Sequence, residues 1–166
     1  MAGPTAFSTA RTALDACAAA GLKIATAESC TGGLVAAALT DIPGSSAVFE
    51  RGFVTYSNEA KQSLLGVAAA TIAQFGAVSA QTAKAMAEGA LSNSLADIAV
   101  SITGIAGPDG GSAHKPVGLV HFACARKGFP TIALERRFGP LKRGDIRTRA
   151  VDAALTLIRE TAQRRP

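Results

Sequence analysis

The stretch DIAVSIT, residues 97–103, is the most informative segment for the fold. It is β-branched and almost entirely apolar, as expected of a central strand that is buried on both faces of a sheet. A glycine-rich segment, residues 104–118, follows it directly. Open α/β sheets bind ligands beyond the carboxyl ends of their strands, so this segment is a candidate binding loop. A long hairpin connection without a ligand explains its composition equally well.

The rest of the chain alternates predicted strands and helices. Short apolar or alternating runs predict strands at residues 22–27, 52–57, 119–125 and 131–138. Apolar residues at helical spacing predict helices at residues 5–20, 32–44, 79–95 and 145–162, and one more that carries Lys61. Ser57 and Ser79 are candidate N-caps. This order predicts a mixed sheet covered by helices on both faces, in one domain over residues 1–166.

The composition excludes several classes of protein. The 166 residues are 48% hydrophobic and 17% charged, which excludes intrinsic disorder. The net charge of +5 suits an anionic partner, and Arg143 or Arg147 could recognise a phosphate. Tryptophan is absent and tyrosine occurs once, so the chain lacks a base-stacking platform for nucleic acid. We expect a small anionic ligand and no nucleic acid.

Cysteine and histidine placement predicts a cytoplasmic protein without a metal. Three cysteines are an odd number, none forms a C-x-x-C motif, and no secretory signal is present, so we expect reduced thiols. No uncharged apolar run reaches ~18 residues, so we expect no membrane span. Neither His114 nor His121 has a partner at metal-ligand spacing.

Reactive side chains are densest in ESCTGG, residues 28–33, at the junction of a predicted strand and helix. The start of a helix offers free backbone N–H groups to an anion or an oxyanion. The simpler alternative is that Ser29 and Thr31 cap the helix and the glycines allow close packing. Cys30 is either a nucleophile or a small buried thiol.

Lys61 is the second candidate. It lies in the first turn of the helix after Tyr56-Ser57-Asn58, where the helix dipole disfavours a cation. The dipole and partial burial would both lower the pKa of this lysine, and a neutral amine can act as a general base. A serine paired with a neutral lysine activates a hydroxyl without histidine. A solvated surface lysine is the ordinary alternative.

Four blocks of the sequence resemble one known family. They are TAESCTGGLVAAALTDIPGSS (residues 26–46), FERGFVTYSNEAKQSLLGV (49–67), GAVSAQTA (76–83) and SITGIAGPDGG…KPVGLVHFA (101–123). These blocks are similar to the C-terminal domain family of the competence/damage-inducible protein CinA. The resemblance implies a three-layer α/β/α sandwich, often as a homo-oligomer.

The resemblance also implies an activity. Stand-alone members of this family are nicotinamide-nucleotide amidases, which hydrolyse nicotinamide mononucleotide to nicotinate mononucleotide and ammonia in pyridine nucleotide salvage. They resemble Ser/Lys hydrolases that use no metal or other cofactor. By this resemblance Lys61 is the base and Tyr56 a neighbouring site residue. Ser46 is the first choice of nucleophile and Ser29 the second.

The predicted reaction is an acyl transfer. Lys61 takes the proton of Ser46, whose oxygen attacks the carboxamide carbon of the nicotinamide ring. Backbone N–H groups at the helix start, or the Thr103 hydroxyl, would stabilise the oxyanion. Substrate contacts are expected at these positions: Glu28, Thr31, Gly32, Gly33, Thr103, Gly104, Gly107 and Arg143. Arg143 stands where the family pattern F-x-G-D-R is replaced by FGPLKR. The alternative function is a non-catalytic nucleotide-binding module that assembles with a partner.

Overall fold

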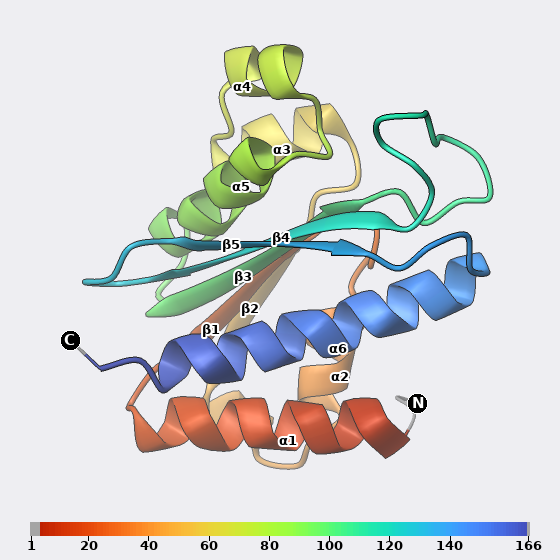
Figure 1. The fold of residues 1–166 in the computed structure, drawn as a ribbon. Helices are drawn as coiled ribbons and strands as arrows, with labels where there is room; N and C mark the ends of the chain where they lie inside the picture. Colours follow the sequence, from red (N-terminus) through yellow and green to blue (C-terminus); the bar gives the residue numbers. More distant parts are fainter. Residues whose placement is uncertain (1–3, 166) are drawn as a thin grey trace.

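A five-stranded mixed sheet forms the centre of the protein, which a computed structural model describes over residues 4–165. Its strands are β1 (Ile24–Glu28), β2 (Phe49–Val54), β3 (Ile98–Gly104), β4 (Leu119–Arg126) and β5 (Ile132–Arg137). The strand order is β2-β1-β3-β4-β5 (Figure 1). β1 is parallel to both β2 and β3, whereas β4 is antiparallel to β3 and to β5. The predicted mixed sheet is therefore confirmed.

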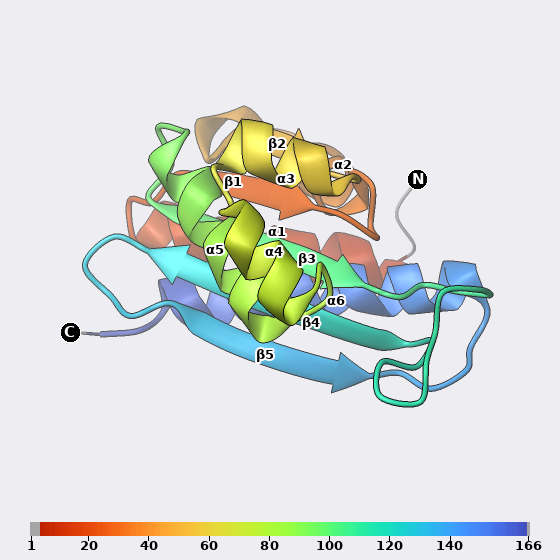
Figure 2. The same ribbon diagram turned by 90° about the horizontal axis from the view of Figure 1, so that it is seen from above.

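Helices lie on both sides of this sheet. They are α1 (Pro4–Ala19), α2 (Leu34–Thr40), α3 (Asn58–Leu65), α4 (Ala69–Phe75), α5 (Ala80–Ser92) and α6 (Arg143–Ala162), with a short 3₁₀ helix, η1 (Ser45–Ala47). Figures 1 and 2 show α1, α2 and α6 on one side and α3, α4 and α5 on the other. This arrangement is the predicted three-layer α/β/α sandwich.

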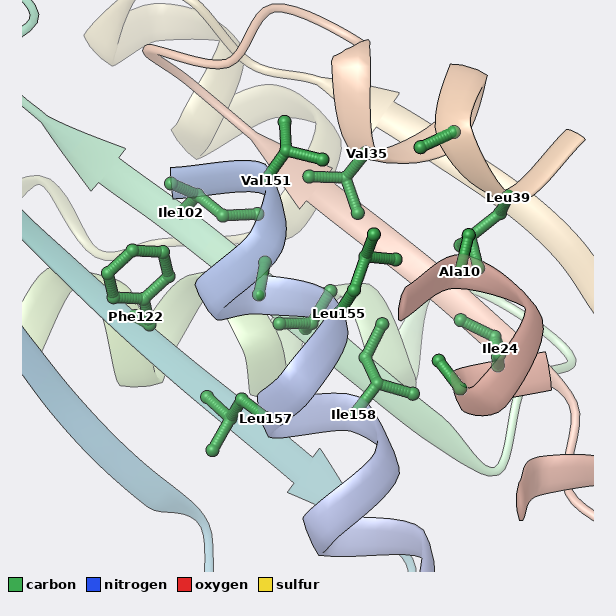
Figure 3. Packing of buried hydrophobic residues seen from close by; sticks show 14 of the residues in the cluster. Ala10, Ile24, Val35, Leu39, Ile102, Phe122, Val151, Leu155, Leu157 and Ile158 are labelled. Atoms are coloured by element: carbon green, nitrogen blue, oxygen red, sulfur yellow. The ribbon is translucent and has the colours of Figure 1, made fainter. Parts of the chain in front are cut away.

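The larger part of the hydrophobic core lies between the sheet and helices α1, α2 and α6. Figure 3 shows its side chains, among them Ile102 and Phe122 from the sheet and Leu155 from α6, all fully buried. Burying one such large side chain stabilises the fold by roughly 1.5–3 kcal/mol. Ala10 of α1 and Ala154 of α6 are also fully buried, and such small side chains allow the two helices to pack closely.

Local signals in the sequence mark several helix ends correctly. Ser57 caps α3, because its side chain accepts a hydrogen bond from the N–H of Ala60 at 3.0 Å. Ser79 caps α5 in the same way by accepting from Thr82. These contacts confirm both predicted N-caps.

Two elements differ from the prediction. β2 begins at Phe49, three residues before the predicted strand at 52–57, because charged residues such as Glu50 and Arg51 are tolerated on an edge strand. Helix α4 was not predicted. Its seven residues include no side-chain cap and no buried residue, so neither capping nor hydrophobic periodicity marks it. No helix within residues 4–165 is long and apolar enough to cross a membrane.

Candidate active site

The candidate site is a cavity of about 250 Å³ at the carboxyl ends of β1 and β3. After β1 the chain crosses to β2 on one side, and after β3 it continues to β4 on the other. Neighbouring parallel strands whose connections diverge in this way leave a crevice between them, which is the usual ligand site of open α/β sheets. The topology therefore explains why the cavity lies here.

Six of the residues predicted for the site line this cavity. They are Ser29, Tyr56, Lys61, Thr103, Gly104 and Arg143. Sequence reasoning did not place Asn58, Ala77 or Val78 in the site, although all three line the cavity. The sequence placed Asn58 only in the segment that leads into the helix with Lys61, and the other two lie in a stretch for which no element was predicted.

Ser29 and Lys61 form the reactive pair of the cavity. Ser29 directly follows β1, and Lys61 lies in α3 with 1% of its surface exposed. The Lys61 Nζ atom donates to Ser29 Oγ at 3.1 Å and to the carbonyl oxygen of Thr55 at 3.0 Å. Burial lowers the pKa of Lys61, because the charged ammonium loses solvation. The structure thus combines a serine hydroxyl with an amine that is biased toward its neutral form.

Ser46, the first-choice nucleophile, lies far from Lys61. It belongs to η1, which precedes β2, whereas Lys61 follows β2. A strand of this length spans roughly 17–20 Å, so the two residues lie beyond opposite ends of β2. The structure therefore does not bring Ser46 beside Lys61, and Ser29, the second choice, is the serine that contacts the lysine.

Glu28, predicted to contact the substrate, is used by the backbone instead. Its side chain is buried, and its two carboxylate oxygens accept the N–H groups of Val35 at 2.8 Å and Ala36 at 3.0 Å. These donors belong to the first turn of α2, whose N–H groups have no partner within the helix. Glu28 therefore fastens α2 to the end of β1, and we correct its assignment from binding to structure.

Replacing Glu28 by Gln is expected to reduce the free energy of unfolding by about 2–4 kcal/mol. The amide keeps one acceptor oxygen but turns its NH₂ group toward a buried N–H donor, which is left unpaired. Urea denaturation of Glu28→Gln measures this loss. The exposed Glu59 of α3 provides the matched control, since Glu59→Gln should change stability by less than about 0.5 kcal/mol. Equal stability of the two variants would contradict the role of Glu28.

Three predicted contact residues shape the turn after Ser29 and are not among the residues that line the cavity: Thr31, Gly32 and Gly33. Gly32 and Gly33 have φ angles of 56° and 101°, in a backbone region that side chains disfavour. The Gly32 N–H donates to the carbonyl oxygen of Ser29 at 3.0 Å. Thr31 is fully buried. These three predicted substrate contacts are therefore reassigned to the geometry of the turn.

The glycine-rich segment contributes to the cavity in part. Thr103 and Gly104 line it, but the Thr103 hydroxyl donates to the carbonyl oxygen of Ala77 at 2.7 Å. The sequence suggested that the Thr103 hydroxyl donates to an oxyanion. Because its proton is already donated to Ala77, it is not placed to do so. Gly107 is not among the residues that line the cavity. Its carbonyl oxygen accepts a hydrogen bond from Arg143 Nη1 at 2.8 Å.

Arg143 reaches the cavity despite the altered family pattern around it. It is the first residue of α6, and its Nη2 donates to the hydroxyl of Tyr56 at 3.0 Å. Both residues are exposed, and both line the cavity. A guanidinium held in this way is suited to a phosphate or carboxylate.

Other nucleophiles and pockets are less suited to catalysis. Burial raises the pKa of the Cys30 thiol to about 11, which leaves the protonated and unreactive form at neutral pH. Within residues 4–165 no three His, Cys, Asp or Glu side chains are grouped to hold a metal ion. A larger hollow of about 510 Å³ lies between β5 and α6, but the described residues around it include no serine, cysteine, lysine or histidine.

Comparison with known proteins shows the family of the chain. Residues 6–162 match the family model of the CinA C-terminal domain. The chain belongs to this family. In the crystal structure of the competence/damage inducible protein CihA from Agrobacterium tumefaciens, a chain with 49% identity superposes with a TM-score of 0.95, over 99% of both chains. The predicted resemblance to the CinA C-terminal domain family is therefore confirmed.

Relatives of this CinA-family chain differ in length. A protein of Enterobacter agglomerans named nicotinamide-nucleotide amidohydrolase PncC is 52% identical over 142 residues, which cover 86% of this chain and 87% of that protein. A competence-damage inducible protein of Caldicellulosiruptor bescii is 63% identical over 106 residues. That match covers 64% of this chain but only 26% of the relative, so the chain spans about a quarter of it.

Proposed function

We propose that the chain is a nicotinamide-nucleotide amidase, which hydrolyses the carboxamide of nicotinamide mononucleotide to nicotinate mononucleotide and ammonia. The observation that carries the proposal is the contact of 3.1 Å between the buried Lys61 Nζ and Ser29 Oγ, inside a cavity at the sheet edge. The relative named nicotinamide-nucleotide amidohydrolase supports the choice of substrate. The reaction is a step of pyridine nucleotide salvage.

Acylation begins with proton transfer from Ser29 to Lys61. The neutral amine accepts the hydroxyl proton across the existing contact, and the serine oxygen attacks the carboxamide carbon. The Thr55 carbonyl oxygen accepts a hydrogen bond from the same Nζ and so holds the amine beside Ser29. The lysine ammonium then returns its proton to the leaving nitrogen. Ammonia departs, and the nicotinate mononucleotide acyl group remains on Ser29 as an ester.

The negative oxygen that forms during attack needs hydrogen-bond donors. The residue directly after Ser29, Cys30, lines the cavity, and its N–H donates to no oxygen within residues 4–165. We assign the Cys30 amide to the oxyanion, in place of the Thr103 hydroxyl. Removing one such donor from an amidase typically costs ~10²–10³ in rate.

Deacylation repeats the same steps with water. Lys61, neutral again, accepts a proton from a water molecule whose oxygen attacks the ester carbon, and it then protonates Ser29 as the acid leaves. Arg143 at the rim would bind the ribose phosphate, with Tyr56 holding its guanidinium. No step requires a metal or another cofactor.

The proposal is tested by measuring ammonia release from nicotinamide mononucleotide with the purified protein. We expect saturable turnover with this substrate and much slower turnover with nicotinamide, which lacks the phosphate that Arg143 would bind. Calorimetric titration of the nucleotide accompanies the assay. Binding without ammonia release would contradict the amidase and support the alternative, a non-catalytic nucleotide-binding module.

The homo-oligomeric state, the cytoplasmic location and the single-domain organisation stay predictions. Light scattering of the purified chain tests the first and cell fractionation the second. Limited proteolysis tests the third, since a chain with one domain should yield no stable half.

A further inference from the structure

Arg147 binds the main chain beside Ser29. It lies in the second turn of α6 and is half-buried. Its Nε donates to the carbonyl oxygen of Cys30 at 3.1 Å, and its Nη2 donates to that of Thr31 at 3.1 Å. We propose that Arg147 is a positioning residue that fixes the turn at residues 29–33, so that the Cys30 amide faces the oxyanion. This role rests on the proposed amidase function.

The hydrogen bonds of the turn connect Arg147 to the Cys30 amide that we assign to the oxyanion. In a trans peptide the C=O and N–H point in opposite directions. The carbonyl of Cys30 belongs to the peptide that follows Cys30, so Arg147 fixes that peptide directly. The carbonyl of Thr31 shares its peptide with the N–H of Gly32, which donates to Ser29 O at 3.0 Å. That acceptor in turn shares its peptide with the N–H of Cys30.

A helix end shares one of these carbonyl oxygens with Arg147. The Leu34 N–H, at the start of α2, donates to the carbonyl oxygen of Thr31 at 3.1 Å, alongside the guanidinium. The turn is therefore held by α6 through Arg147 and by α2 through Leu34 and the carboxylate of Glu28. Figure 1 shows α2 and α6 on the same side of the sheet, where both can reach the end of β1.

Phosphate binding, which the sequence also allowed for Arg147, fits this geometry less well. Arg147 is not among the residues that line the cavity, whereas Arg143 is. Two of the three guanidinium nitrogens of Arg147 are already engaged by carbonyl oxygens. The planar fork of arginine suits two acceptors at once, which a lysine cannot match with its single ammonium. The two interpretations predict different kinetic effects.

The test measures kcat and KM for ammonia release in Arg147→Ala and Arg147→Lys, together with hydrogen exchange of a peptide covering residues 29–34. We expect kcat to fall about 10²-fold in Arg147→Ala and at least ~10-fold in Arg147→Lys, with KM changing less than about threefold. Amide exchange in the peptide should become faster in both variants. Arg149→Ala removes a neighbouring exposed arginine of α6 and should match the wild type.

Specific outcomes would overturn the proposal. A kcat within twofold of the wild type in both variants excludes a positioning role. A rise in KM alone, with unchanged exchange, assigns Arg147 to substrate binding instead. If Arg147→Ala does not fold, Arg147→Lys decides the question alone. If the wild-type protein releases no ammonia, the amidase proposal fails, and unchanged exchange in the variants separately overturns the role of Arg147 in holding the turn.

Discussion

Ser29→Ala is expected to reduce ammonia release from nicotinamide mononucleotide by at least ~10³-fold, whereas Ser46→Ala leaves it unchanged. The reason is position. Ser29 Oγ lies 3.1 Å from the Lys61 amine, whereas Ser46 lies before β2, at the opposite end of that strand from Lys61. Without the Ser29 oxygen no acyl-enzyme can form, while the cavity and the Arg143 contact remain.

Steady-state ammonia assays on both variants measure this effect, and thermal unfolding shows whether each is folded. Ser29 is half-buried and loses only one oxygen, so we expect the unfolding temperature of Ser29→Ala to stay close to that of the wild type. An active Ser29→Ala together with an inactive Ser46→Ala would contradict the account and restore Ser46 as the nucleophile.

Lys61→Met is expected to lower kcat by about 10³-fold, because methionine fills a similar volume but accepts no proton. The exposed Lys84 of α5 offers a matched control, and Lys84→Met should keep full activity. Methionine leaves the Thr55 carbonyl oxygen without the Lys61 hydrogen bond, at a cost of about 1–3 kcal/mol. The substitution also removes the free-energy penalty of burying a polar amine, which offsets that cost. The variant should therefore remain folded.

The pH dependence of the wild type gives an independent measure of Lys61. Only the neutral amine can accept the Ser29 proton, and the neutral fraction grows as the pH rises. The value of kcat/KM should therefore increase with pH, with a midpoint below the ordinary lysine value of 10.5, since burial lowers the pKa of Lys61. A profile that stays flat from pH 6 to pH 10, or that falls, would contradict a lysine base.

Much of the fold is encoded in patterns that act locally. The apolar run at residues 97–103 forms most of β3, whose residues 98–103 are buried, because a strand covered on both faces is apolar on both faces. Ser57 and Ser79 mark helix starts because a cap satisfies N–H groups close to it in the chain. Helix α4 lacks such a signal, and tertiary contact with α5 places it.

The candidate site was predictable in its composition but not in all its roles. The sequence itself argued against a contact between Ser46 and Lys61. The predicted strand at residues 52–57 lies between them in the chain and so places them beyond opposite ends of that strand. Glu28 and Arg147 could not be assigned in this way. Both bind main-chain atoms of segments brought near by folding, at Val35 and at Cys30, and residue type alone does not reveal a backbone partner.

During turnover, Ser29 is expected to become acylated by the substrate. Acid quenching of the protein with nicotinamide mononucleotide, followed by peptide mass spectrometry, tests it most directly. We expect the nicotinate mononucleotide acyl group as an ester on the peptide that contains Ser29, and no such ester in Ser29→Ala. Continued ammonia release with no acylated peptide, or with the acyl group on another residue, would contradict it.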